Sequence, residues 1–201
     1  LHAGQAPIQR TLQPIIKTDA VMQLLRKHFE ENMLTPTAIN RYMRCQLQFF
    51  YRYVSGIIEP NNDDDDAIDN RIFGNIFHLA AQLIYKKLKQ KSRTIVAEDI
   101  EYLLQTEVDI QRAVDEAFKS ELFKIKDPAR PLPPLDGLQI INREVIIKYI
   151  RQLLEIDLRL TPFTILGLEK LVKIEFEILM CNETFTTMLG GTIDRLDSIT
   201  N

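Results

Sequence analysis

The chain has 201 residues, of which 45% are hydrophobic and 26% are charged. This composition is typical of a globular protein with one domain, or one domain and an appendage, and it excludes a disordered chain or a fibre. The formal net charge of −3 disfavours a protein that coats nucleic acid through bulk charge. No apolar run approaches the roughly 20 residues of a membrane span. The two cysteines, Cys45 and Cys181, exclude a disulfide-rich fold and favour a reducing, cytoplasmic compartment.

The first 54 residues predict an extended lead-in and two helices. Thr18 is a candidate N-cap, because apolar residues recur every three or four positions after it. Thr35-Pro36 predicts a second helix start, since proline is favoured at the first helical position. We expect this helix to run through Val54. Its predicted apolar face holds Tyr42, Met43, Leu47, Phe50 and Val54, and its opposite face holds Arg41, Arg44, Gln48 and Arg52.

The middle of the chain predicts four more helices. A run of acidic residues, Asp63 to Asp66, reads as a loop before a helix over about 72–91. Further helices are expected from Ala97 and through 108–118, and prolines between 128 and 134 mark a break. A long helix over 138–160 then carries Ile141, Val145, Tyr149, Leu153 and Ile156 on one face.

After Pro162 the apolar period changes to the alternation of strands, with a hairpin turn at Asn182-Glu183. The fold class is therefore α+β, mostly helical with a C-terminal antiparallel hairpin or sheet. We divide the chain into a lead-in and first helix (1–33) and a main domain (34–201), helical over 34–160 and stranded over 163–199. Because an antiparallel ribbon is marginal alone, we expect more sheet to follow Asn201.

One candidate site residue lies on the predicted helix over 72–91. Gly74, His78, Ala81 and Tyr85 share a face at helical spacing, and the small residues would let another backbone approach closely. His78 has two interpretations. It is either a buried imidazole satisfied by a hydrogen bond, or a metal ligand or general base.

A second candidate lies in the last predicted strand, Gly191-Thr192-Ile193-Asp194-Arg195-Leu196-Asp197. Asp194 shares a strand face with Thr192 and Leu196, while Arg195 and Asp197 face the other way. An aspartate among apolar residues is costly unless it is paired or binds a cation. The alternative is an Asp–Arg surface pair at the end of a hairpin.

Three charged segments have both a structural and a functional interpretation. The run from Asp63 to Asp66 reads as a solvated loop, because adjacent carboxylates lack the spacing of a calcium loop. The basic run that begins with Lys86 and Lys87 reads as a solvated helix end or as a phosphate-contact patch. Arg41, Arg44 and Arg52 form either a polar outer face or a contact with a DNA backbone.

Three segments, in this order, resemble RecB/AddB-type nuclease domains of the PD-(D/E)XK superfamily. Residues 34–54 resemble the opening helix, with its Thr cap, Tyr, Arg-Cys and Phe-Phe-Tyr. Gly74 and His78 match the Gly-x-x-x-His helix, and residues 191–197 match the Gly-x-Ile-Asp-Arg-x-Asp strand. The resemblance covers about Leu34 to the end and implies a partial restriction-endonuclease-like fold.

The resemblance implies a metal-dependent DNA nuclease from a helicase–nuclease-type repair or recombination protein. His78 and Asp194 would be catalytic ligands of Mg²⁺ or Mn²⁺. A carboxylate on a following strand would be the next ligand, and a lysine two residues on would position the attacking water. DNA would be the substrate, contacted through Arg41, Arg44, Arg52, Lys86 and Lys87.

The sequence departs from that pattern because Asn201 precedes any Asp/Glu-x-Lys strand. We therefore expect this chain alone to be inactive or nearly so. With only Cys181 to accompany it, Cys45 cannot build an iron–sulfur cluster and is expected to be a buried thiol. Two other functions stay open: a non-catalytic module that binds DNA ends or a partner on the same scaffold, and a helical interaction protein. The last would be favoured if His78 and Asp194 lay far apart.

Overall fold

The computed structural model describes residues 14–57, 68–127, 129–180 and 183–199. The chain divides into two compact units, one of residues 1–60 and 172–191, the other of residues 61–171 and 192–201. The predicted acidic loop at Asp63 to Asp66, the hairpin turn at Asn182 and the second cysteine, Cys181, lie outside the described residues.

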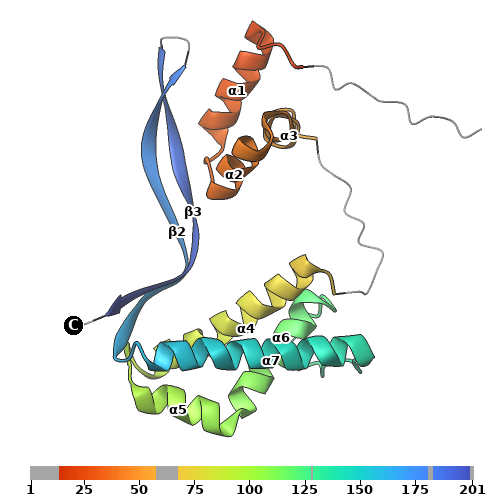
Figure 1. Ribbon diagram of the computed structural model, residues 1–201, viewed down its shortest axis with the longest axis vertical. Helices are drawn as coiled ribbons and strands as arrows, with labels where there is room; N and C mark the ends of the chain where they lie inside the picture. The colour runs from red at the N-terminus through yellow and green to blue at the C-terminus, as the bar shows by residue number, and fades with distance from the viewer. Residues whose placement is uncertain (1–13, 58–67, 128, 181–182, 200–201) are drawn as a thin grey trace, which may run out of the picture. The chain divides into compact units, whose positions relative to one another are not determined.

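The first unit begins with two helices that confirm the predicted caps (Figure 1). Helix α1 (Asp19–Glu31) starts after Thr18, whose side chain accepts a hydrogen bond from the Val21 amide. Helix α2 (Pro36–Arg44) starts after Thr35, whose side chain accepts from the Ala38 amide, and Pro36 occupies its first turn. Both hydroxyls satisfy amides that a helix end leaves without an intrahelical partner.

The predicted helix does not continue unbroken from Thr35 to Val54. Cys45 adopts an extended conformation (φ −160°, ψ 108°), and it separates α2 from the short helix α3 (Gln46–Phe49) and a π-helical turn, η1 (Phe50–Val54). A break resets the helical period, so a face counted through Cys45 is not continuous. Phe49 is buried, whereas Met43 is 78% exposed. The expectation of a buried Cys45 thiol is wrong, because this cysteine is exposed.

Strands β2 (Phe163–Met180) and β3 (Glu183–Ile199) are hydrogen-bonded neighbours, and each contributes residues to both units. In the first unit, Leu34 forms a parallel bridge with Leu189, and the Thr187 hydroxyl donates to the Phe29 carbonyl at 2.9 Å. A Cβ at Gly190 would lie 2.2 Å from the Val172 carbonyl oxygen, so this close approach requires glycine.

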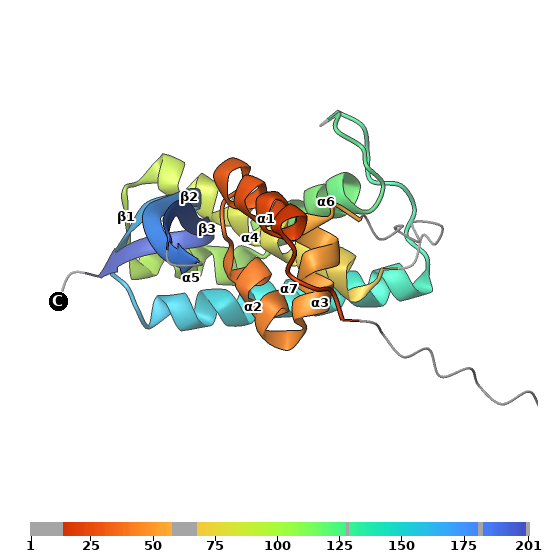
Figure 2. The same ribbon diagram turned by 90° about the horizontal axis from the view of Figure 1, so that it is seen from above.

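The second unit is built on four helices: α4 (Asn70–Lys91), α5 (Ala97–Thr106), α6 (Val108–Glu121) and α7 (Gly137–Leu158). Asp69 and Asp136 cap α4 and α7. Figures 1 and 2 show α4, α6 and α7 packed against one another. Their apolar faces form one core, in which Ile76, Val114, Phe118 and Ile146 are fully buried.

A three-stranded antiparallel sheet, in the order β1-β2-β3, completes the predicted α+β fold. Strand β1 (Thr94–Ile95) pairs with the start of β2, with Thr94 opposite Thr164 and Ile95 opposite Phe163. Ile95 and Phe163 are both buried in the core. Strand β1 was not predicted from the sequence, because two residues are too few to show the alternation of a strand.

Helix α7 carries apolar residues on two faces. The face that packs on the core holds Ile146, Ile147, Ile150 and Leu154. The stripe identified from the sequence is the more exposed one, since Ile141, Tyr149 and Ile156 are 59%, 47% and 55% exposed. Periodicity alone does not decide which of the two stripes is buried; packing does.

Two substitutions on α7 test this assignment. Ile150→Ala should lower the free energy of unfolding by about 2–5 kcal/mol, because it leaves a cavity in the core. Ile141→Ala makes the same chemical change on the exposed face and should shift it by no more than about 0.5 kcal/mol. Urea denaturation measures both, and equal losses would contradict the packing of α7.

Candidate active site

His78 on α4 and Asp194 on β3 face one another, although 115 other residues separate them in the sequence. The distance from His78 Nδ1 to Asp194 Oδ2 is 3.3 Å. The side chains are 57% and 63% exposed, so His78 is not a buried core histidine. Asp194 is not the partner of Arg195 either, which bonds Asp157 and Asp197. The condition that favoured an interaction protein, a large separation of this pair, is absent.

Local structure explains the exposure of both side chains. On α4 four of the five buried residues, Ile76, Ala80, Ile84 and Leu88, recur every four positions on a face that does not include His78. Tyr85, about two turns beyond His78, is also buried, through contacts of its own. On β3 the side chains alternate, so Asp194 points outward while Arg195 points inward. A Cβ at Gly74 would meet no described atom within 4 Å, so the close backbone approach expected there is not found.

Arg195 lies in a buried cluster directly beside this pair. Its Nη2 donates to Asp157 Oδ1 at 2.8 Å, and its Nη1 donates to the other carboxylate oxygen. The Tyr85 hydroxyl also donates to Asp157, whose side chain is only 2% exposed. The guanidinium carbon lies 4.3 Å from the ring centre of Tyr85 and 5.4 Å from that of Phe163. The cluster joins α4, α7, β2 and β3.

Burial and charge shift the pKa values in this cluster. Burial, followed by the charge of Asp157, raises the pKa of the Tyr85 hydroxyl. Burial alone would lower the pKa of Arg195, but the hydrogen bond to Asp157 and the surrounding charges raise it above its usual value. Burial raises the pKa of Asp197, against the attraction of Arg195. Asp197 Oδ1 is buried and has no hydrogen-bond partner in the described part of the chain.

The His78–Asp194 pair offers one imidazole nitrogen and one carboxylate to a cation. The carboxylate suits Mg²⁺ or Mn²⁺, which keep several water ligands and need few protein groups, whereas imidazole is a more common ligand of other divalent transition metals. The exposure of both side chains leaves room for water and for a phosphate. Within the described ranges, no group of three or more His, Cys, Asp or Glu side chains could hold a metal ion. The donor set therefore fits a hydrated divalent cation, and not a closed structural site.

The predicted DNA-contacting arginines are in the first unit. The Arg41 guanidinium lies over the Tyr53 ring at 5.7 Å. Arg44 and Arg52 are exposed. Because the chain breaks at Cys45, these three residues do not lie on one continuous helix as the sequence suggested.

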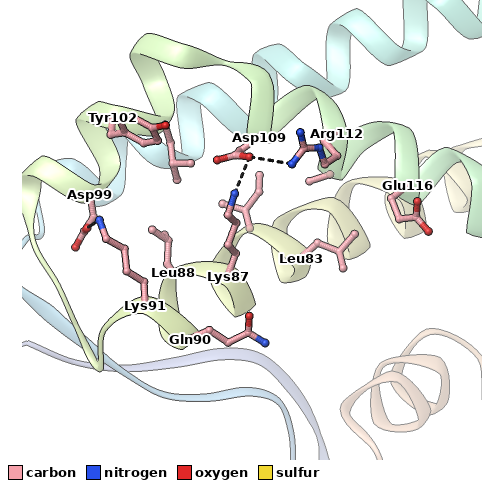
Figure 3. A pocket seen from close by; sticks show the side chains of 13 residues that line it. Leu83, Lys87, Leu88, Gln90, Lys91, Asp99, Tyr102, Asp109, Arg112 and Glu116 are labelled. Atoms are coloured by element: carbon pink, nitrogen blue, oxygen red, sulfur yellow. Dashed lines mark hydrogen bonds and ion pairs between the residues drawn. The ribbon is translucent and has the colours of Figure 1, made fainter. Parts of the chain in front are cut away.

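The two predicted lysines on α4 differ in their surroundings. Lys86 is exposed. Lys87 Nζ lies 2.7 Å from Asp109 Oδ1, so the Asp109 carboxylate compensates the charge of Lys87. Lys87 lines a cavity of about 870 Å³ between α4, α5 and α6, and Figure 3 shows its side chain directed at Asp109. Neither His78 nor Asp194 lines this cavity.

Asp157 and Tyr85 had no predicted role in the site. Tyr85 was placed on the His78 face of the helix, but nothing indicated its partner. The available signal for Asp157 was a carboxylate between two apolar residues of α7, Ile156 and Leu158. A buried carboxylate needs a partner, and that need alone does not identify which arginine supplies it.

Comparisons with known proteins identify a family. A family model described as the PD-(D/E)XK nuclease superfamily matches residues 33–201. No curated protein matches the chain. Among the described residues, none of the helices has the length and hydropathy needed to cross a membrane.

The lining of the cavity supports a pH-dependent prediction. Lys91 Nζ bonds Asp99 Oδ1 at 2.5 Å, and this hydrogen bond holds the pKa of Asp99 below its usual range. The contribution of Asp99 to stability should therefore be fully present above its unfolded-state pKa, and be lost as the pH falls through its folded-state pKa. Asp99→Asn should have a lower free energy of unfolding than the wild type at pH 7, and this difference should shrink in acid. Urea denaturation measures both values.

The exposed Glu101 on the same helix provides the control. Glu101→Gln should leave the acid dependence unchanged. A difference between the wild type and Asp99→Asn that persisted at the lowest pH would contradict the assignment.

Proposed function

The chain belongs to the PD-(D/E)XK nuclease superfamily, and from this premise we propose that residues 34–201 form a metal-dependent DNA nuclease domain whose cation is held by His78 and Asp194. The supporting observation is their contact of 3.3 Å. Helix α4 and strand β3 bring together one nitrogen and one carboxylate donor that the sequence keeps far apart.

The proposed chemistry is phosphodiester hydrolysis. A bound Mg²⁺ or Mn²⁺ would lower the pKa of water and offset the charge that develops on the scissile phosphate. His78 and Asp194 would hold the cation at the surface, where a DNA backbone has access to it. The carboxylate of Asp194 would otherwise repel phosphate, so the cation would also reverse the local charge.

Contacts with the DNA backbone are proposed at local basic patches, which the overall net charge does not exclude. Arg44, Arg52 and Lys86 are exposed and have the charge for phosphate contacts. Arg41 lies over Tyr53, and Lys87 pairs with Asp109, so we expect their contributions to be smaller. We propose that the domain belongs to a helicase–nuclease-type repair or recombination protein of the cytoplasm.

A non-catalytic module that binds DNA ends or a partner is the alternative on the same scaffold. Nuclease action needs a further carboxylate and a lysine near the cation, which the proposal assigns to an Asp/Glu-x-Lys strand. The described residues contain no third carboxylate or histidine grouped with His78 and Asp194. The two functions therefore share DNA binding and differ in cation binding and cleavage.

Direct titration with Mn²⁺ tests the cation site without relying on catalysis. Asp194→Asn and His78→Ala should each weaken Mn²⁺ binding by about 10-fold or more, because each removes one of two protein donors. Isothermal titration calorimetry or the Mn²⁺ electron paramagnetic resonance signal measures the affinity. Glu155→Gln, at an exposed carboxylate on α7, is the matched control. Equal affinities for all four proteins would exclude this cation site.

Cleavage of linear DNA tests the activity. In a longer form of the protein in which an Asp/Glu-x-Lys strand follows Asn201, Asp194→Asn should slow Mg²⁺-dependent cleavage by about two orders of magnitude or more. Product release on denaturing gels measures the rate. Binding of DNA ends without cleavage by the unsubstituted longer form would favour the non-catalytic module instead.

A further inference from the structure

We propose that Arg195, Asp157 and Tyr85 are positioning residues, which hold Asp194 against His78 without touching the cation or the substrate themselves. The inference deepens the proposed function, on which it rests, by naming the device that keeps the two donors together. The cluster lies between the two elements that carry those donors.

The cluster connects α4 and β3 next to the pair. Arg195 follows Asp194 directly on β3 and points to the other side of the strand. Tyr85 lies on α4 about two helical turns beyond His78. Asp157 on α7 bonds both of them, through the two Arg195 nitrogens and the Tyr85 hydroxyl. A displacement of β3 along α4 would therefore have to break this cluster.

The His78–Asp194 contact cannot fix its own geometry. Both side chains are more than half exposed, and exposed ion pairs contribute little because water and salt screen them. The Asp157–Arg195 pair has the opposite character, since its side chains are only 2% and 19% exposed. Moving the partners of a buried pair apart would leave an uncompensated charge in the protein interior. The geometry of the Asp157–Arg195 pair is therefore far harder to change than that of His78 and Asp194.

The geometry of the cluster fixes the position of Arg195 as well as compensating its charge. Two parallel N–H···O bonds to one carboxylate fix the plane of the guanidinium, which a single ammonium cannot do. The rings of Tyr85 and Phe163 flank that guanidinium. In a strand, a slip of one residue would move Asp194 to the opposite face, and it would also separate Arg195 from Asp157.

The test combines two readouts on the chain, one of which needs no metal. The ring resonances of His78, one of three histidines, report its contact with Asp194 by nuclear magnetic resonance. Asp194→Asn should shift these resonances in the wild-type background and leave them unchanged in an Asp157→Asn background. Asp157→Asn should also weaken Mn²⁺ binding by about 10-fold, within the range for residues that support ligands.

A double-mutant cycle separates positioning from a general loss of structure. The variant Asp157→Asn with Asp194→Asn should bind Mn²⁺ no more weakly than Asp194→Asn alone, because Asp157 would act through Asp194. Ile150→Ala, at a buried site on the same helix, should lower stability. In the folded protein it should leave the Mn²⁺ affinity intact, and also the shift of the His78 resonances that Asp194→Asn causes (the His78 response). If Ile150→Ala reproduced the effects of Asp157→Asn, the positioning role would be overturned.

Tyr85→Phe keeps the proposal testable if Asp157→Asn fails to fold. It removes one hydrogen bond to Asp157 but keeps the ring beside Arg195, and it should weaken Mn²⁺ binding by about 2- to 10-fold. Unchanged Mn²⁺ affinity and an unchanged His78 response in Tyr85→Phe, and in Asp157→Asn where that variant folds, would overturn the positioning role. If the wild type bound no Mn²⁺ but the His78 response still depended on Asp157, the cation proposal would fail and the positioning role would stand.

Discussion

One ion pair, formed by the buried Asp157 on α7 and the half-buried Arg195 on β3, ties together three elements of the second unit. Neither charge could lie in this environment alone, because the desolvation of an isolated ion costs several kcal/mol or more. Together they are satisfied by two parallel hydrogen bonds, by the Tyr85 hydroxyl and by Asp197, whose Oδ2 lies 2.8 Å from Arg195 Nε. The pair requires α4, α7 and β3 to meet at one point.

This constraint links the core to the surface. On one side of β3, Arg195 joins a cluster continuous with the apolar core through Phe163 and Tyr85. On the other side, Asp194 reaches the solvent beside His78. Because side chains alternate along a strand, the positioning role proposed for Arg195 would let a buried contact, which is hard to deform, place the exposed carboxylate of Asp194, whose own contact with His78 contributes little energy. A hydrated cation needs accessible donors of this kind.

Much of this arrangement could be predicted from the sequence where the signal is local. Thr18, Thr35 and the change from helical to strand period are local features, and the structure contains the helices and strands that they indicate. The break at Cys45 was missed, because a single extended residue leaves the apolar pattern on either side intact. The buried face of α7 was also undetermined, since two apolar stripes compete and only packing selects one. His78 and Asp194 were singled out as candidates through motifs, and their contact fits that prediction, whereas the partners of Arg195 depend on contacts between distant elements that no local pattern encodes.

The central claim is that one divalent cation is held by His78 and Asp194 together. Paramagnetic broadening by substoichiometric Mn²⁺ tests it most directly, because the effect falls steeply with distance from the ion. The account predicts that the ring resonances of His78 broaden in the wild type at Mn²⁺ concentrations that leave the other histidines sharp, and that Asp194→Asn abolishes this selectivity. If His78 stayed sharp in the wild type, or broadened equally in Asp194→Asn, the claim would be contradicted.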